Sequence, residues 1–249
     1  MLVEQTMEKL SSMRMLGMIA CLQTFLAEPN RRDLAPLDLV GLLVDAEWVH
    51  RDNARLTQRL RNAKLKQQAC IEDIDYTHAR GLVKATMLEL QTSRWIREHQ
   101  NVAITGPTGV GKSYLACALG HKACRDGFTV AYRRVSRLFD ELAQARADGT
   151  LPLLLRRFAK VDVLILDDFG LEVLSAADRK GLLEVLEDRY STSSTIITSQ
   201  LTTDAWHAAI GDPTLADAIL DRLVHNAHRI TLKGDSIRRA KSTLTKPQK

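Results

Sequence analysis

The chain has 249 residues, of which 45% are hydrophobic and 26% are charged, a composition typical of a globular protein with a sizeable core. No apolar run reaches the roughly 18 residues that a membrane-spanning helix needs, and the acidic N-terminus lacks the basic start of a signal peptide. We therefore expect a cytoplasmic protein with no membrane partner. The net charge of +5 and the pI near 9.1 favour a polyanionic partner.

The cysteines and histidines show no pattern of a metal site. Cys21, Cys70, Cys117 and Cys124 contain no CxxC pair, so we expect reduced thiols. Cys117 and Cys124 fall on one expected helix and are predicted to be core residues. The close histidine pair, His225 and His228, has no further cysteine or histidine ligand nearby, so we expect no structural zinc.

The first 70 residues are expected to form a small all-α domain, residues 1–70. Apolar residues in 2–26 recur at helical spacing, and a second helix is expected to begin near Pro36. The second half of that helix becomes basic, with six lysines or arginines against one aspartate between positions 51 and 66. Three arginines four residues apart stack on one face and are either DNA contacts or a solvated surface: Arg51, Arg55 and Arg59.

Residues 71–249 are expected to form an α/β domain. After a helical stretch at 82–99, short apolar runs alternate with helical segments. Strands that alternate with helices predict right-handed crossovers and a parallel sheet covered on both faces. The expected five strands are 101–105, 128–133, 161–168, 194–200 and 228–233. Trp48, Trp95 and Trp206 lie in helical patterns and are predicted to be core residues rather than surfaces on which bases stack.

The stretch GPTGVGKS at 106–113 matches GxxxxGK[ST] and lies directly after an expected strand and at the start of a helix. Glycines at these positions let main-chain N–H groups surround phosphate oxygens at the positive end of a helix. Lys112 would reach the β- and γ-phosphates of ATP, and Ser113 would bind Mg²⁺. The expected ATP-binding residues here are Gly106, Pro107, Thr108, Gly109, Val110, Gly111, Lys112, Ser113 and Tyr114.

Acidic and polar residues follow two further strands. In VDVLILDDFG, Asp167 would hold Mg²⁺ through its waters. Some ATPases have an extra strand between the glycine motif and this acidic strand, and the run FTVAYR is such a strand here. In those ATPases the residue at the position of Asp168 polarises the attacking water; the alternative is that Asp168 only caps the strand. Aspartate is shorter than the usual glutamate, so slow hydrolysis is expected. After the next strand, either Ser199 or Gln200 would sense the γ-phosphate or orient the water. The chain has no NKxD and no LSGGQ motif, which favours an ATPase over a GTPase or a transporter-type ATPase.

Beyond these motifs, the chain resembles the IstB-like insertion-sequence ATP-binding proteins, relatives of the DnaC-type helicase loaders in the AAA+ superfamily. The resemblance covers nearly the whole chain through RLRNAKLKQQACIEDIDY, NVAITGPTGVGKSYLACALG, VLILDDFG, TIITSQ, LADAILDRLVHNAHRI and GDSIRRAKS. It implies a lidless AAA+ type of P-loop NTPase, because 16 residues follow position 233. It also implies that ATP lies between neighbouring subunits of a homo-oligomer.

In that family an arginine of one subunit reaches the γ-phosphate bound by the next, and Arg222 falls at this position; the alternative is a surface ion pair. Arg238 matches an arginine that serves as a second phosphate sensor. Relatives carry a DNA-facing helical element at YRRVSRLFDEL, which makes Arg133, Arg134 and Arg137 DNA candidates, with Lys160, Arg156 and Arg157 as weaker ones. Such contacts to DNA phosphates would be largely independent of the DNA sequence.

These features predict an ATP-dependent DNA-binding helper of a transposase, with ATP and Mg²⁺ as cofactors. It would oligomerise with ATP on duplex target DNA, offer that DNA to the transposase and dissociate after ATP hydrolysis. One alternative is a replicative helicase loader of the same architecture. The other is a nucleotide switch in which hydrolysis is incidental.

Overall fold

The computed structural model describes residues 2–27 and 34–237, which belong to two compact units, Met1–Gln58 and Arg59–Lys249. The units divide within helix α3 (Pro36–Ala63), before the boundary at residue 70 expected from the sequence. The end of α3 belongs to the second unit because Ala63 is fully buried and Arg59 Nε donates to the Cys124 carbonyl over 2.8 Å. Within the described ranges, no helix is both long and apolar enough to cross a membrane.

The first unit consists of helices, as expected. The periodic segment at 2–26 forms two helices, α1 (Leu2–Ser12) and α2 (Leu16–Ala27), because the chain turns at Arg14, whose φ is 57°. Gly17 lies against α3: a Cβ there would lie 2.5 Å from the Ala46 carbonyl oxygen. The Gly17 N–H donates to Glu47 Oε2 over 2.8 Å, so a carboxylate caps the positive end of α2.

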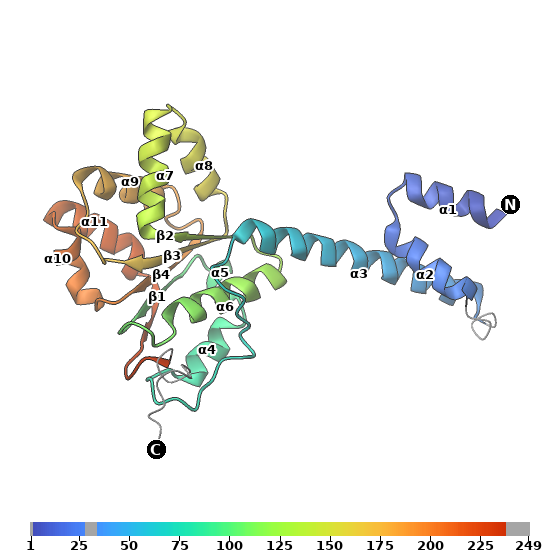
Figure 1. Cartoon of the computed structure of the whole chain (residues 1–249), viewed down its shortest axis with the longest axis horizontal. Helices are drawn as coiled ribbons and strands as arrows, with labels where there is room; N and C mark the ends of the chain where they lie inside the picture. The colour runs from blue at the N-terminus through green and yellow to red at the C-terminus, as the bar shows by residue number, and fades with distance from the viewer. Residues whose placement is uncertain (1, 28–33, 238–249) are drawn as a thin grey trace, which may run out of the picture. The chain divides into compact units, whose positions relative to one another are not determined.

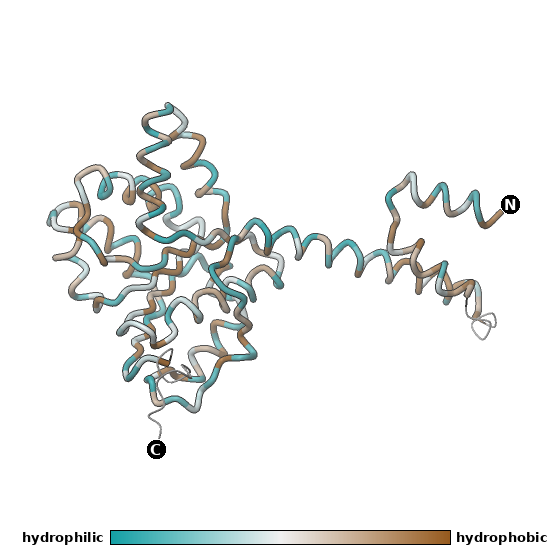
Figure 2. Tube along the Cα trace, in the orientation of Figure 1, coloured by the Kyte–Doolittle hydropathy of each residue, from teal (hydrophilic) through white to brown (hydrophobic). Residues whose placement is uncertain are grey.

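Large apolar side chains of this unit are exposed. Trp48 was expected in the core, but 70% of it is exposed, so that expectation was wrong. Leu2 and Leu37 are each 81% exposed. In Figure 2, α2 is largely brown and the second half of α3 is largely teal, so apolar and basic residues occupy different parts of the unit's helices. These helices therefore leave apolar surface without a cover from the described residues.

The second unit is built on a five-stranded parallel sheet in the order β2-β3-β4-β1-β5, which confirms the predicted sheet. The strands are β1 (Asn101–Thr105), β2 (Val130–Arg134), β3 (Val163–Phe169), β4 (Ser194–Ser199) and β5 (Ala227–Thr231). Its longer helices are α6 (Lys112–Arg125), α7 (Val135–Ala147), α8 (Leu151–Ala159), α9 (Ala176–Glu187) and α11 (Pro213–Val224). The shorter ones are α4 (Lys84–Leu90), α5 (Arg94–Arg97), η2 (Thr203–Ala205) and α10 (Trp206–Ile210).

Alternate residues of the central strands face opposite layers of helices. Leu164 and Leu166 of β3 belong to a core formed with α7, α8, α9, α10 and α11. Ile165 contacts Gly120 of α6 on the other face, and Figure 1 shows α6 opposite the layer that contains α7 and α9. Trp95 and Trp206 are buried, as expected, and so are Cys117 and Cys124. Because β1, β3 and β4 are parallel, their carboxyl ends lie at one edge of the sheet.

Candidate functional site

The loop between β1 and α6 has the conformation that the glycine motif requires. Gly111 has a φ of 99°, and a Cβ there would lie 2.7 Å from an Arg80 guanidinium nitrogen. Lys112 is 6% exposed, and its Nζ donates to the carbonyls of Gly106 and Pro107 over 2.7 and 2.8 Å. Burial lowers the pKa of Lys112, while Asp168 and Asp167 act against this shift. The lysine is thus held inside the loop by main-chain oxygens that can release it to phosphate.

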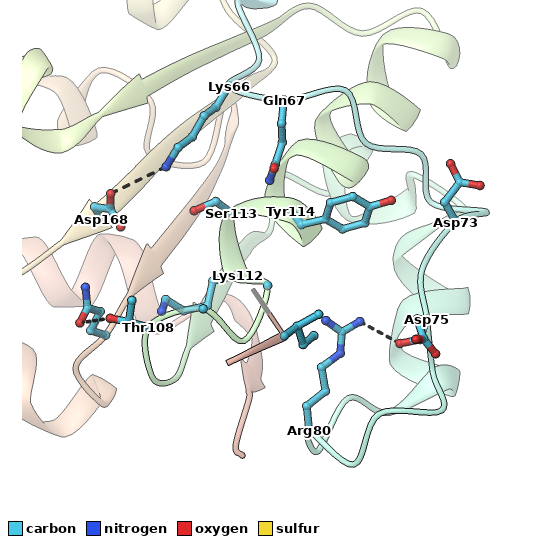
Figure 3. Close-up of a pocket in the computed structure, with 14 residues that line it drawn as sticks. Lys66, Gln67, Asp73, Asp75, Arg80, Thr108, Lys112, Ser113, Tyr114 and Asp168 are labelled. Carbon is cyan, nitrogen blue, oxygen red and sulfur yellow. Dashed lines mark hydrogen bonds and ion pairs between the residues drawn. The ribbon is translucent and has the colours of Figure 1, made fainter. Parts of the chain in front are cut away.

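A cavity of about 370 Å³ opens beside this loop (Figure 3), a size within the usual range of small-molecule sites. Several of the expected nucleotide residues line it: Thr108, Gly109, Gly111, Lys112, Ser113, Tyr114, Asp168 and Gln200. Six expected residues do not: Gly106, Pro107, Val110, Asp167, Ser199 and Arg222. Asp167 nevertheless reaches the site, because Ser113 donates to it.

Asp167 is fully buried, and four side chains donate to its carboxylate. Oδ1 accepts from Ser113 at 2.6 Å and from Thr198 at 2.7 Å, while Oδ2 accepts from Tyr132 at 2.6 Å and from Lys66 at 3.0 Å. Burial alone would raise the pKa of Asp167, but these hydrogen bonds hold the pKa below its usual range. Asp167 is therefore a fixed carboxylate anion.

Asp168 turns toward the same cavity although it follows Asp167 directly in β3. Successive strand residues normally point to opposite faces. Here the register of β3 and β4 shifts between Leu166 and Phe169, and Asp168 has a φ of 66°. Its carboxylate pairs with Arg134 Nε at 3.0 Å, and Lys66 Nζ lies 4.0 Å away. The irregularity therefore brings two adjacent carboxylates to one site.

At the end of β4 the structure distinguishes the two candidate sensors by their contacts. Gln200 lines the cavity and accepts a hydrogen bond from the Thr108 hydroxyl over 2.7 Å. Ser199 is fully buried, and its hydroxyl donates to the Phe169 carbonyl over 2.7 Å. Of the pair, Gln200 is the side chain that faces the cavity.

Residues from the segment before β1 also line the cavity, although none of them was expected in the nucleotide site. Lys66, Gln67, Asp73, Asp75 and Arg80 all line the cavity, together with Ile237. Arg80 is 5% exposed and donates to the carbonyls of Val110 and Asp75 over 3.1 and 3.0 Å. It therefore connects the glycine loop to the segment that precedes β1. Four of these residues, Lys66, Gln67, Asp73 and Asp75, fall within RLRNAKLKQQACIEDIDY, and the family resemblance of this stretch was the signal that could have indicated them.

Of the two arginines expected to reach phosphate, Arg222 and Arg238, only Arg222 is among the described residues. Arg222 lies on α11, outside the cavity, where it pairs with Glu187 and donates to the Ala218 carbonyl over 2.8 Å. Its guanidinium carbon lies over the Tyr190 ring, 5.7 Å from the ring centroid. Arg238 lies outside the described residues.

Of the arginines expected to contact DNA, Arg133 is 9% exposed. It pairs with Glu141 at 2.8 Å and lies 5.5 Å from the centroid of the Phe158 ring. The structure thus gives Arg133 an internal role, whereas Arg137 is exposed and pairs with Asp140 at 3.4 Å. Among the others, Arg51 pairs with Glu47, Arg55 is exposed, Arg59 donates to Cys124 and Arg134 pairs with Asp168.

A second cavity, of about 350 Å³, lies along the edge strand β2. It is lined by five cationic residues, Arg59, Lys64, Arg133, Arg157 and Lys160, and no carboxylate of the described residues lines it. We call it the basic cleft. Lys64, Arg157 and Lys160 are exposed, so their charges are accessible to a large anion.

Residues 8–245 match the family described as IstB-like ATP binding protein. A relative from Sinorhizobium fredii, named "Putative insertion sequence ATP-binding protein y4pL", is 53% identical over 96% of this chain and 98% of its own length. A relative from Mycobacterium tuberculosis, named "Putative ATP-binding protein Rv3427c in insertion sequence", is 35% identical over 92% of each chain.

Among solved structures, DnaI has a TM-score of 0.58 at 24% identity, covering 66% of this chain and 91% of its own. The DnaC helicase loader has a TM-score of 0.55 at 19% identity, with 66% and 97% covered. At such identities these likenesses show the fold alone. The match along nearly the whole chain and the identity to its relatives show that the protein belongs to the IstB-like ATP-binding protein family.

Proposed function

We propose that this protein is an ATP-dependent DNA-binding helper of a transposase. The observation that carries the proposal is the convergence of Lys112, Ser113, Asp168 and Gln200 on one cavity, from the ends of three parallel strands, with Asp167 bonded to Ser113. Such an arrangement fits a bound triphosphate with its metal. The link to transposition comes from relatives whose names place them in insertion sequences.

The donors at this site fit magnesium. Ser113 Oγ lies 2.6 Å from Asp167 Oδ1, so a hydroxyl and an anionic carboxylate meet at the cavity. The described residues contain no cluster of three or more histidine, cysteine or acidic side chains that could hold a metal alone. Magnesium suits such a sparse site because it keeps several waters and shares its ligands with phosphates. When bound, it would neutralise charge on the phosphates.

Hydrolysis would depend on residues around the γ-phosphate position. Asp168 would orient and polarise the attacking water, and Gln200, which also lines the cavity, would hold that water or the phosphate. Arg222 lies outside the cavity of its own subunit, as an arginine that serves a neighbouring subunit must. In that role it would release Glu187 and neutralise transition-state charge in the adjacent site.

The basic cleft and the neighbouring exposed arginines would bind duplex DNA through its phosphates. The cleft gathers five cations without a lining carboxylate, and Arg134 and Arg137 follow on the same edge strand and α7. Arg133 would support the cleft from inside rather than contact DNA directly, since its guanidinium already pairs with Glu141. Binding of this kind is strong at low salt and largely independent of sequence.

The N-terminal unit would serve assembly. Its large apolar side chains are exposed: 81% of Leu2, 81% of Leu37 and 70% of Trp48. Exposed apolar surface of this kind is typical of an interaction site. A second copy of this unit would bury such a surface. ATP would order subunits on DNA through the shared sites, and hydrolysis would release them.

A helicase loader is the second candidate, because the fold of the second unit is similar to those of DnaI and DnaC. The two candidates differ in the nucleic acid that they bind. A transposition helper that selects target DNA would prefer a duplex and respond to a transposase. A loader would prefer single strands and respond to a helicase.

Sedimentation of the protein with duplex DNA, in Mg²⁺-ATP and then in Mg²⁺-ADP, tests nucleotide use, assembly and DNA binding together. We expect large complexes in ATP and their loss in ADP. Lys112→Ala removes the ammonium expected to bind phosphate and should abolish the complexes, whereas Lys180→Ala, on the exposed face of α9, should preserve them. Complexes that form equally in ATP, in ADP and with Lys112→Ala would refute the proposed function.

A further inference from the structure

Lys66 lies in the nucleotide cavity, although no motif accounts for it. It follows the end of α3 and points from there toward Asp168, and Ser113 lies between it and Lys112 (Figure 3). Its Nζ lies 3.0 Å from Asp167 Oδ2 and 4.0 Å from Asp168 Oδ2. Two lysines from distant parts of the chain therefore line one cavity.

The two lysines are held differently. Lys112 is nearly buried, and its ammonium is bonded to two uncharged carbonyls of its own loop. Lys66 keeps 43% of its side chain exposed, and its ammonium is bonded to the carboxylate of Asp167. Of the four described side chains that donate to Asp167, Lys66 is the one that carries a charge. The contact is therefore electrostatic and free to rearrange.

Binding of Mg²⁺-ATP would change the charges around Lys66. Once Ser113 and Asp167 hold a divalent cation, the ammonium of Lys66 faces a like charge where it now contacts a carboxylate. A γ-phosphate between Lys112 and Asp168 would at the same time offer an anionic acceptor within reach. A lysine with a mobile stem can exchange one acceptor for the other.

We propose that Lys66 is a second phosphate-binding lysine, which leaves the two carboxylates and donates to the γ-phosphate when ATP binds. It thereby makes the site discriminate ATP from ADP, since ADP offers no such acceptor. This inference rests on the proposed nucleotide site and adds to it a residue that determines specificity. Lys112, in contrast, contributes to the binding of both nucleotides because it reaches the β-phosphate as well.

The test compares the affinities of the full-length protein for β,γ-imido-ATP and for ADP, each with Mg²⁺, by calorimetry. Lys66→Met should weaken binding of the ATP analogue about tenfold, the size of one charge-assisted hydrogen bond, and change ADP affinity less than about twofold. Lys66→Arg keeps the charge and should retain most of the preference. Lys180→Met serves as the matched control, because Lys180 is exposed and does not line the cavity.

Two results would overturn the inference while leaving the nucleotide site intact. In the first, Lys66→Met binds both nucleotides like the wild type. In the second, it binds the ATP analogue more tightly, which would make Lys66 a placeholder that competes with magnesium. If the wild-type protein binds neither nucleotide, the proposed site itself fails and this inference fails with it. Circular dichroism of each variant verifies that it is folded.

Discussion

The contact between Arg134 and Asp168 predicts how DNA would control hydrolysis. Arg134 Nε lies 3.0 Å from Asp168 Oδ2, and 54% of the arginine side chain is exposed against 16% of the aspartate. A carboxylate bonded to a guanidinium is a weaker acceptor for the proton of an attacking water. A DNA phosphate that binds Arg134 would free the carboxylate. Arg134→Ala should therefore raise the basal ATPase rate.

The size of this effect follows from the exposure of the pair. An ion pair this exposed is worth about 0.2–1 kcal/mol, so the paired form outnumbers the free form by about 1.4 to 5. Without the pair, the free fraction of Asp168 rises about twofold to sixfold, and the basal rate should rise equally. The assay is phosphate release without DNA and at saturating duplex DNA, where the wild type and Arg134→Ala should converge.

Arg137→Ala is the matched control, because Arg137 is 77% exposed and pairs with Asp140 rather than with Asp168. It removes a candidate DNA contact of the same charge and should leave the basal rate unchanged. A basal rate of Arg134→Ala at or below that of the wild type would refute the reasoning. The arginine would then support Asp168 instead of restraining it.

Three further predictions concern single side chains. Arg222→Ala should preserve nucleotide affinity and lower ATP turnover about 10³-fold if the arginine acts on a neighbouring site, and a wild-type rate would exclude that role. Glu187→Ala, which only frees Arg222, should retain turnover. Tyr132→Phe removes a 2.6 Å hydrogen bond to buried Asp167 and should lower the free energy of unfolding by about 1.5–3 kcal/mol in urea titrations at pH 7. Hydrogen bonds depress the pKa of Asp167, so the difference in unfolding free energy between the wild type and Tyr132→Phe should shrink as the pH falls below about 4. A difference that stays constant with pH would contradict this role of the hydrogen bond. Arg189 is buried and donates to three main-chain carbonyls, so Arg189→Met should cost about 3 kcal/mol or more, and an unchanged urea midpoint would contradict that role.

The sheet and the glycine loop could be predicted because both are local in sequence. Five apolar runs alternate with helical segments, and the motif at 106–113 lies between a strand and a helix. Local patterns also placed Asp167 and Asp168 at the end of β3. They could not show that Asp168 lines the cavity while its neighbour Asp167 is bonded to Ser113, because that depends on a register shift and on the positive φ of Asp168.

Contacts between segments that are distant in the sequence could not be predicted from local patterns. Lys66 reaches Asp167 across the fold, and Thr198 and Tyr132 reach it from two other strands. The helical periodicity around Trp48 was the same as that of a core helix, yet the unit has no described element that covers this side chain. Arg133 likewise has the sequence context of a surface arginine, but Glu141 and Phe158 enclose it.

These contacts would make the paired aspartates a point of coupling between the nucleotide loop, the end of α3 and the edge strand β2. Ser113 connects Asp167 to the nucleotide loop, Lys66 connects both carboxylates to the end of α3, and Arg134 connects Asp168 to the edge that carries the basic cleft. Each of these groups makes a charged or charge-assisted contact that a phosphate or a metal would compete for. Nucleotide, DNA and helix α3 would thus act on the same two carboxylates, so a change in one contact alters the acceptors available to the others. A double substitution of Lys66 and Arg134 should therefore give a non-additive change in the basal ATPase rate, as expected for groups that share partners.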